Sequence, residues 1–157
     1  MSENQKKRTA LITGASAGIG REMALVFAAE GFDLVLVARR EEVQGKYGTV
    51  SHIVVADLAD PAAPRALFDE MAARHIMVDA LVNNAGYTVP GHFRDTTWGD
   101  QAALIQVMVT AVAELCHLFG PGMAARNYGR IINVASLAGH LPGAAGGTLY
   151  AASKSFV

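Results

Sequence analysis

The feature that most constrains this sequence is the alternation of short apolar runs with stretches of helical pattern. The runs predict five β-strands, at residues 9–13, 33–38, 51–56, 79–83 and 130–134. Helices are predicted at residues 20–30, 60–75 and 100–118, and a further helix is expected from Tyr150 onward. Alternating strands and helices are typical of a parallel sheet, and strands that are apolar throughout are covered on both faces. We therefore predict an α/β fold with a doubly wound parallel sheet and helices on both faces.

Local signals set the predicted starts of two helices. Asp60 followed by Pro61 predicts an N-cap and a first-turn proline for the helix at residues 60–75. Asp95 or Thr96 is the predicted cap of a helix that begins near this point.

Composition bounds the class of protein. The chain has 157 residues, of which 52% are apolar, and this length and core suit one domain over residues 1–157. Lys and Arg number 13 against 14 Asp and Glu, so no large basic surface for nucleic acid is expected. Cys116 is the single cysteine, and the polar N-terminus MSENQKKR is unlike a signal peptide. These features predict a cytoplasmic protein.

Membrane and metal sites are also not expected. The longest apolar stretch, residues 102–119, is interrupted by polar residues, so it is not expected to span a membrane. The five histidines show no metal-ligand spacing.

A glycine-rich loop follows the first predicted strand. Its pattern, G-x-x-x-G-x-G, comes from Gly14, Gly18 and Gly20, with Ser16 and Ile19 between them, and a helix follows. Glycine allows a tight turn and a close approach to a pyrophosphate, and the helix N-terminus offers free N–H groups to phosphates. A turn without a ligand is the simpler alternative. The strand–loop–helix context favours a dinucleotide site in a Rossmann-type sheet.

Two arginines follow the second predicted strand, where the adenosine ribose of a bound dinucleotide would lie. An acidic residue there favours NAD, whereas an arginine accommodates the 2′-phosphate of NADP. Arg39 and Arg40 occupy this position, so we predict NADP(H) over NAD(H). The alternative is that both are solvated at a strand end.

Four further segments accompany the glycine loop. They are Asp57-Leu58 after the third strand, N-N-A-G at residues 83–86, Ser136 after the fifth strand, and Tyr150-x-x-x-Lys154. In this order and combination they resemble the short-chain dehydrogenase/reductase family, in its main single-domain branch. The resemblance implies an NAD(P)-binding domain over nearly the whole chain.

The resemblance also implies roles for these residues. Tyr150 would exchange a proton with the substrate oxygen, Ser136 would hold that oxygen, and Lys154 would bind the nicotinamide ribose. A tyrosine normally titrates near pH ~10, and Lys154, on the same helical face, would lower that pKa. Cofactor contacts are implied for the following residues: Asp57 and Leu58 at the adenine, and Asn83, Asn84, Ala85 and Gly86 along the floor of the site. The N-N-A-G residues could instead serve strand-end turns, or do both.

The chain departs from the family pattern at several points. Met108 stands where the family has a catalytic Asn, and a thioether has no donor to replace the amide. Gln106 and Thr110 are nearby candidates to supply that group. The connection at residues 39–50 is only 12 residues long, which predicts a stunted helix or residues missing near Glu41. The sequence stops at Val157, so the C-terminal strands of the family are expected to be absent and the domain incomplete.

These features are compatible with three functions. The leading hypothesis is an NADP(H)-dependent oxidoreductase acting on a carbonyl or secondary alcohol, with Tyr150 as acid and base. The alternative is a nucleotide-binding protein of the same family with little or no turnover, because of Met108. A sugar-nucleotide epimerase ranks low, because that branch spaces its glycines G-x-x-G-x-x-G. The helix at residues 101–119 is apolar on nearly all sides, and the family resemblance implies that it packs against a partner subunit, which predicts a homo-oligomer. The alternative is a core helix beneath a missing C-terminal part.

Overall fold

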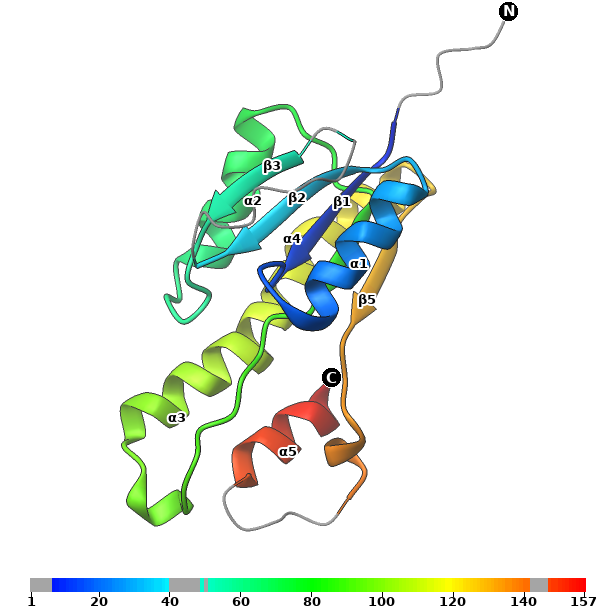
Figure 1. The fold of residues 1–157 in the computed structure, drawn as a ribbon. Helices are drawn as coiled ribbons and strands as arrows, with labels where there is room; N and C mark the ends of the chain where they lie inside the picture. The colour runs from blue at the N-terminus through cyan, green and yellow to red at the C-terminus, as the bar shows by residue number, and fades with distance from the viewer. Residues whose placement is uncertain (1–6, 40–48, 50, 142–146) are drawn as a thin grey trace, which may run out of the picture.

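A computed structural model describes residues 7–39, 49, 51–141 and 147–157. Five parallel strands form one sheet in the order β3-β2-β1-β4-β5 (Figure 1). The strands are β1 (Thr9–Thr13), β2 (Asp33–Ala38), β3 (Ser51–Val55), β4 (Ala80–Asn83) and β5 (Arg130–Asn133). The predicted doubly wound α/β fold is confirmed, and each strand lies within one residue of its predicted bounds. Arg40 and the short connection near Glu41 lie outside the described residues.

Each face of the sheet has its own core. Alternate residues of β1 point to opposite faces, so Leu11 joins one core while Ala10 and Ile12 join the other. The Leu11 face packs against α2 (Ala63–Ala73) and α4 (Ala111–Ala125). The opposite face packs against α1 (Gly18–Ala29), which lies in front of the sheet in Figure 1. Burial on both sides explains why the strands read as continuous apolar runs.

The start of α2 differs from the prediction. The Asp60 carboxylate accepts a hydrogen bond from the Ala62 N–H at 2.9 Å, and the Asp60 carbonyl accepts one from Ala63 N–H at 3.0 Å. These bonds close a turn before the helix, so that Pro64, rather than Pro61, occupies the first helical turn. Pro61 and Pro64 lie in the same short segment, and the sequence alone does not distinguish which of them begins the helix.

The predicted helix at residues 100–118 is longer and interrupted. It begins as α3 (Trp98–Ile105), continues through a π-helix, η2 (Gln106–Thr110), and becomes α4. Thr97, not Asp95 or Thr96, caps α3 by accepting from the Asp100 N–H at 3.1 Å. The helix continues through Pro121, and Phe119 and Met123 on either side of it are buried in the core beneath the sheet.

Trp98–Ala125 is also long and apolar enough, with a mean hydropathy of 1.8, to cross a membrane by length and composition alone. Its buried side chains, including Leu104, Leu115 and Phe119, pack in the cores of this fold. Core packing accounts for part of this hydropathy, because 39% of the most apolar 18-residue window is buried.

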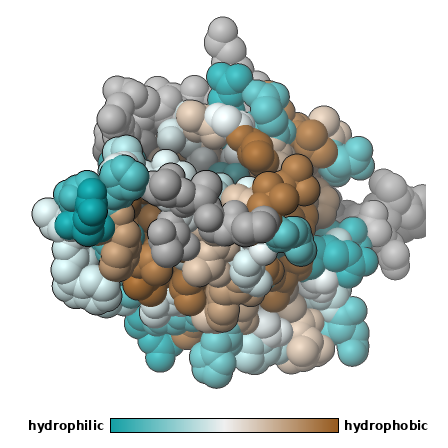
Figure 2. Space-filling view, turned by 90° about the horizontal axis from the view of Figure 1, so that it is seen from below, coloured by the Kyte–Doolittle hydropathy of each residue, from teal (hydrophilic) through white to brown (hydrophobic). Residues whose placement is uncertain are grey.

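The last described elements leave apolar surface uncovered. After β5, a short 3-10 helix, η3 (Leu137–Gly139), leads to α5 (Thr148–Phe156), which lies below the sheet in Figure 1. Ile131 of the edge strand is 41% exposed and Leu137 is 80% exposed. Figure 2, seen from below, shows hydrophobic surface on both sides of the grey atoms.

Candidate functional site

The glycine loop after β1 has a backbone that glycine alone accommodates readily. Gly14 has φ +66°, and a Cβ there would lie 2.9 Å from the Ala85 Cα. Gly18 has φ +57°, but a Cβ there would meet nothing within 4 Å, so this part of the loop borders open space. No described side chain caps the N-terminus of α1. Its free N–H groups, together with this open loop, fit the phosphates of a dinucleotide.

The loops after β1 and β4 are joined by side chains. The Asn84 amide donates to the carbonyls of Thr13 and Gly14 at 3.0 and 3.1 Å. Gly20 lies against the Asn84 amide and the Gly14 carbonyl, with no room for a Cβ. Gly20 therefore supports the loop from behind and is not among the residues that line the cavity described below.

Thr13 is a residue of this site that the sequence reasoning missed. Its buried hydroxyl accepts from the N–H groups of Asn84 and Ala85 at 3.0 and 3.1 Å, and it donates to the Val82 carbonyl at 3.2 Å. The side chain thus extends the pairing of β1 and β4 past the ends of the strands. The sequence feature that could have identified Thr13 is its position directly before Gly14 in the glycine motif.

A cavity of about 730 Å³ lies where the strand order reverses, at the carboxyl ends of β1 and β4. Such a switch point is where open α/β sheets bind ligands. The predicted site residues that line it are Gly14, Ser16, Gly18, Ile19, Arg39, Asp57, Leu58, Asn84, Ala85, Gly86, Ser136, Tyr150 and Lys154. The structure therefore brings the glycine loop and the predicted catalytic side chains to one cavity.

One end of the cavity carries charged side chains. Arg39 follows β2 and Asp57 lies shortly after β3, and both line the cavity. Tyr87, which sequence reasoning did not single out, lies near them. Burial, and secondly the negative charge of Asp57, raise the pKa of the Tyr87 hydroxyl above its usual value. This end can therefore offer a guanidinium, a carboxylate and a neutral phenol to a ligand.

The other end holds Ser136, Tyr150 and Lys154. Lys154 Nζ donates to the Val134 carbonyl at 2.6 Å and lies 5.9 Å from the centroid of the Tyr150 ring. Burial lowers the pKa of the Lys154 ammonium below its usual value. Ser136 Oγ accepts from the Ala138 N–H at 3.2 Å, which leaves its own hydrogen available to another acceptor.

Met108 lies beside this end of the cavity. It is 1% exposed, and a Cβ on Gly86 would lie 3.5 Å from Met108 Cε and 3.7 Å from Lys154 Nζ. The thioether and the ammonium thus flank the same glycine. Of the π-helix, Val107 lines the cavity, whereas Gln106 and Thr110 do not. The two suggested substitutes for the missing amide are therefore not at the cavity wall.

Asn83, which is predicted to line the cofactor floor, does not line this cavity. Asn83 is the last residue of β4, and its amide donates to Asn133 Oδ1 at 2.9 Å and to Cys116 Sγ at 3.3 Å. Neighbouring residues of a strand point to opposite faces, so Asn84 reaches the cavity and Asn83 does not. The same contacts place Cys116 against the β4–β5 pair, where burial raises the pKa of its thiol.

Comparisons with known proteins agree with this geometry. The family model for short chain dehydrogenase matches residues 8–157. A very-long-chain 3-oxoacyl-CoA reductase from Laccaria bicolor is 35% identical over 165 residues, which cover 98% of this chain but 48% of that protein. The chain therefore spans about half the length of that curated relative.

Two solved structures have the same fold. A metagenomic short-chain oxidoreductase in complex with NADP is 34% identical with a TM-score of 0.87, and the match covers 95% of this chain and 70% of that one. A short-chain dehydrogenase from Sphingobium yanoikuyae in complex with NADPH is 35% identical with a TM-score of 0.84, covering 96% and 61%. On its sequence, sheet order and cavity, this chain belongs to the short-chain dehydrogenase/reductase family.

Proposed function

We propose that this protein is an NADP(H)-dependent oxidoreductase that transfers a hydride between the nicotinamide and a carbonyl or secondary alcohol. The observation that carries the proposal is one cavity lined both by the glycine loop and by Ser136, Tyr150 and Lys154. Because both sets of residues line the same cavity, a bound cofactor and the proton-transferring side chains would meet at one substrate. The proposal includes a cytoplasmic homo-oligomer, for which the apolar helical stretch is the support.

The bound nicotinamide would supply or accept the hydride. The chain would handle the oxygen of the substrate. In reduction, Tyr150 would give its phenolic proton to the carbonyl oxygen, and Ser136 would donate a hydrogen bond to the same atom. The charge of Lys154, held near the Tyr150 ring by the Val134 carbonyl, would stabilise the phenolate that remains.

The preference for NADP(H) rests on Arg39. Its side chain lies at the cavity, where a guanidinium can bind the 2′-phosphate through two hydrogen bonds. The related structures in complex with NADP and NADPH support the same choice. Arg40 remains part of the prediction but lies outside the described residues.

A second candidate is a nucleotide-binding protein with little turnover. The observation that favours it is Met108, which places a thioether beside Lys154 and Gly86. A thioether neither donates a proton nor accepts one strongly, so it would supply no step of a proton relay.

The test is oxidation of NADPH with a panel of aliphatic and aromatic ketones. A 3-oxoacyl thioester is included because the fungal relative is named a 3-oxoacyl-CoA reductase. Tyr150→Phe should lower kcat by about 10² to 10⁴, as expected for loss of a general acid, without changing NADPH affinity. Tyr128→Phe, outside this cavity, is the matched control and should keep full activity.

Two outcomes would count against the proposal. Full turnover by Tyr150→Phe would remove Tyr150 from the chemistry. NADPH binding without oxidation by any member of the panel would favour the second candidate.

A further inference from the structure

A second cavity, of about 470 Å³, lies at the opposite edge of the sheet, around the N-terminal ends of the strands. No part of the proposed reaction uses it. Its lining comes from the approach to β1, the starts of β2 and β3, the segment before β4 and the segment before β5. Among them are Lys7, Arg8, Asp33, Asp79, Arg126 and Tyr128.

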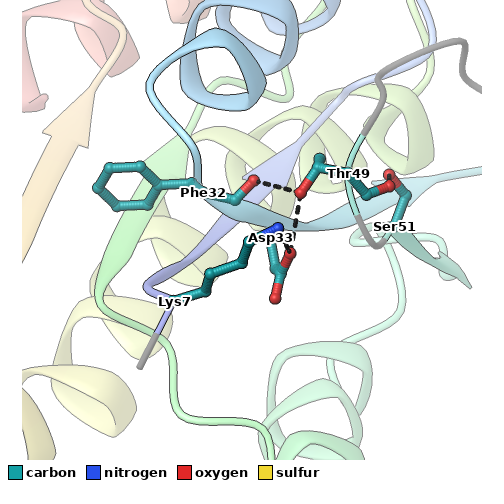
Figure 3. Close-up of polar contacts among 5 residues, drawn as sticks. All are labelled: Lys7, Phe32, Asp33, Thr49 and Ser51. Carbon is teal, nitrogen blue, oxygen red and sulfur yellow. Dashed lines mark hydrogen bonds and ion pairs between the residues drawn. The ribbon is translucent and has the colours of Figure 1, made fainter. Parts of the chain in front are cut away.

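Both carboxylates of this cavity already have partners. Asp33 Oδ1 lies 2.8 Å from the Thr49 hydroxyl and 3.7 Å from Lys7 Nζ (Figure 3). Asp79 accepts from the Thr9 N–H at 3.1 Å and pairs with Arg126 Nη2 at 3.5 Å. Neither carboxylate is therefore left to attract a cation.

Lys7 and Arg126 pair with these two carboxylates, but Arg8 does not. Arg8 stacks on Tyr128, with its guanidinium carbon 3.9 Å from the ring centroid, and no carboxylate pairs with Arg8 among the described residues. Stacking engages the face of a guanidinium and leaves the N–H groups at its edge available. Arg130 lies 5.1 Å from the same ring and adds a second positive charge beside the cavity.

The lining therefore carries a local positive excess on a chain whose net charge is −1. Lys7, Arg8 and Arg126 outnumber Asp33 and Asp79 by one. We propose that this cavity binds a small organic anion through its carboxylate or phosphate group, with Arg8 as the principal cationic contact and Tyr128 as an apolar wall.

The experiment is a calorimetric titration of the protein with sodium phosphate and, separately, with sodium succinate, each at matched ionic strength in sodium chloride. The two probes distinguish a phosphate from a carboxylate ligand. Saturating NADPH is present throughout, so that phosphate is kept out of the glycine loop, and each titration is repeated without NADPH. Arg8→Gln should lower the affinity for the probe about tenfold, as expected for the loss of one charge-assisted contact.

Arg65→Gln is the matched control, because Arg65 also lies over an aromatic ring, that of Phe68, but away from this cavity. It should leave the affinity unchanged. The proposal is overturned if neither probe binds, or if Arg8→Gln binds as tightly as Arg65→Gln. A separate titration of the same variants with NADPH measures cofactor affinity, so a failure here is distinct from a failure of the proposed oxidoreductase activity.

Discussion

The two edges of the sheet are built in different ways. At the carboxyl edge, glycine backbone, the Thr13 hydroxyl and the Asn84 amide fix the loops that surround the first cavity. At the amino edge, ion pairs of side chains such as Lys7 and Arg126 surround the second. Backbone geometry demands particular residues in a fixed order, whereas ion pairs can be made by residues from anywhere in the chain. The site at the carboxyl edge can therefore be recognised from a sequence motif, whereas the cavity at the amino edge can be recognised only in the structure.

The largest expected effect on NADPH affinity comes from Gly14→Ala at the carboxyl edge. A Cβ here would lie 2.9 Å from the Ala85 Cα, on a residue with φ +66°, so the loop must move. NADPH affinity should fall by more than about tenfold, since a shift of this loop displaces its phosphate-binding N–H groups. Fluorescence titration with NADPH measures this.

Gly31→Ala separates strain from steric contact. Gly31 has φ +80°, but a Cβ there would meet nothing within 4 Å. The variant should lose about 1 kcal/mol of unfolding free energy and keep its NADPH affinity. Equal NADPH affinities for the two alanine variants would show that contact with Ala85 does not matter.

Arg39→Asp tests whether charge at the carboxyl edge selects the cofactor. Loss of the guanidinium and the new negative charge should weaken NADP(H) about tenfold or more, while NAD(H) binding is retained or improved. The control is Arg94→Asp, on η1 (Phe93–Asp95), where the side chain is 84% exposed. If NADP(H) affinity survives in Arg39→Asp, the assignment of this arginine is wrong.

Asp79→Ala tests the amino edge. The Asp79 side chain is only 14% exposed and bonds both the Thr9 N–H and Arg126, so its loss should cost about 2 kcal/mol of unfolding free energy. Denaturant unfolding measures this, and NADPH affinity should not change. Asp69→Ala, at an exposed pair with Arg65, should cost less than about 0.5 kcal/mol. Similar losses in both variants would mean that the buried contacts of Asp79 add nothing.

Met108→Asn should have the smallest effect. An amide beside Lys154 can join a proton relay, so kcat with NADPH should rise severalfold, at some cost in stability for a polar group in a buried position. Met108→Leu keeps the position apolar and should leave kcat unchanged. An unchanged rate in Met108→Asn would show that proton transfer proceeds without this position.

Much of the fold could be predicted because the strands are marked by continuous apolar runs and the loops by glycine. The helix boundaries that were predicted wrongly lie where two neighbouring residues could each begin the helix, as with Pro61 and Pro64. The π-helix could not be predicted, because Gln106–Thr110 has no composition that distinguishes it from an α-helix.

The residues that line the first cavity could be predicted from motifs that occur in a fixed order. The hydrogen bonds that hold those residues in place could not. Asn83 and Asn84 are identical in type, and only the alternation at the end of β4 decides which one faces the cavity. The amino-edge residues carry no signal in sequence. Arg8 and Tyr128 are far apart along the chain and meet only because β1 and β5 flank β4.

The π-helix also sets the rotational phase of the long helix. In an uninterrupted α-helix, Leu104 and Met123 would point about 100° apart around the axis. Both are buried, at 1% and 5% exposure, but in different cores, and the wider turn at Gln106–Thr110 lies between them. Deleting a single residue within that turn would therefore restore regular α-helix only by rotating one half of the helix out of its core. This segment should accordingly tolerate substitutions far better than changes in length.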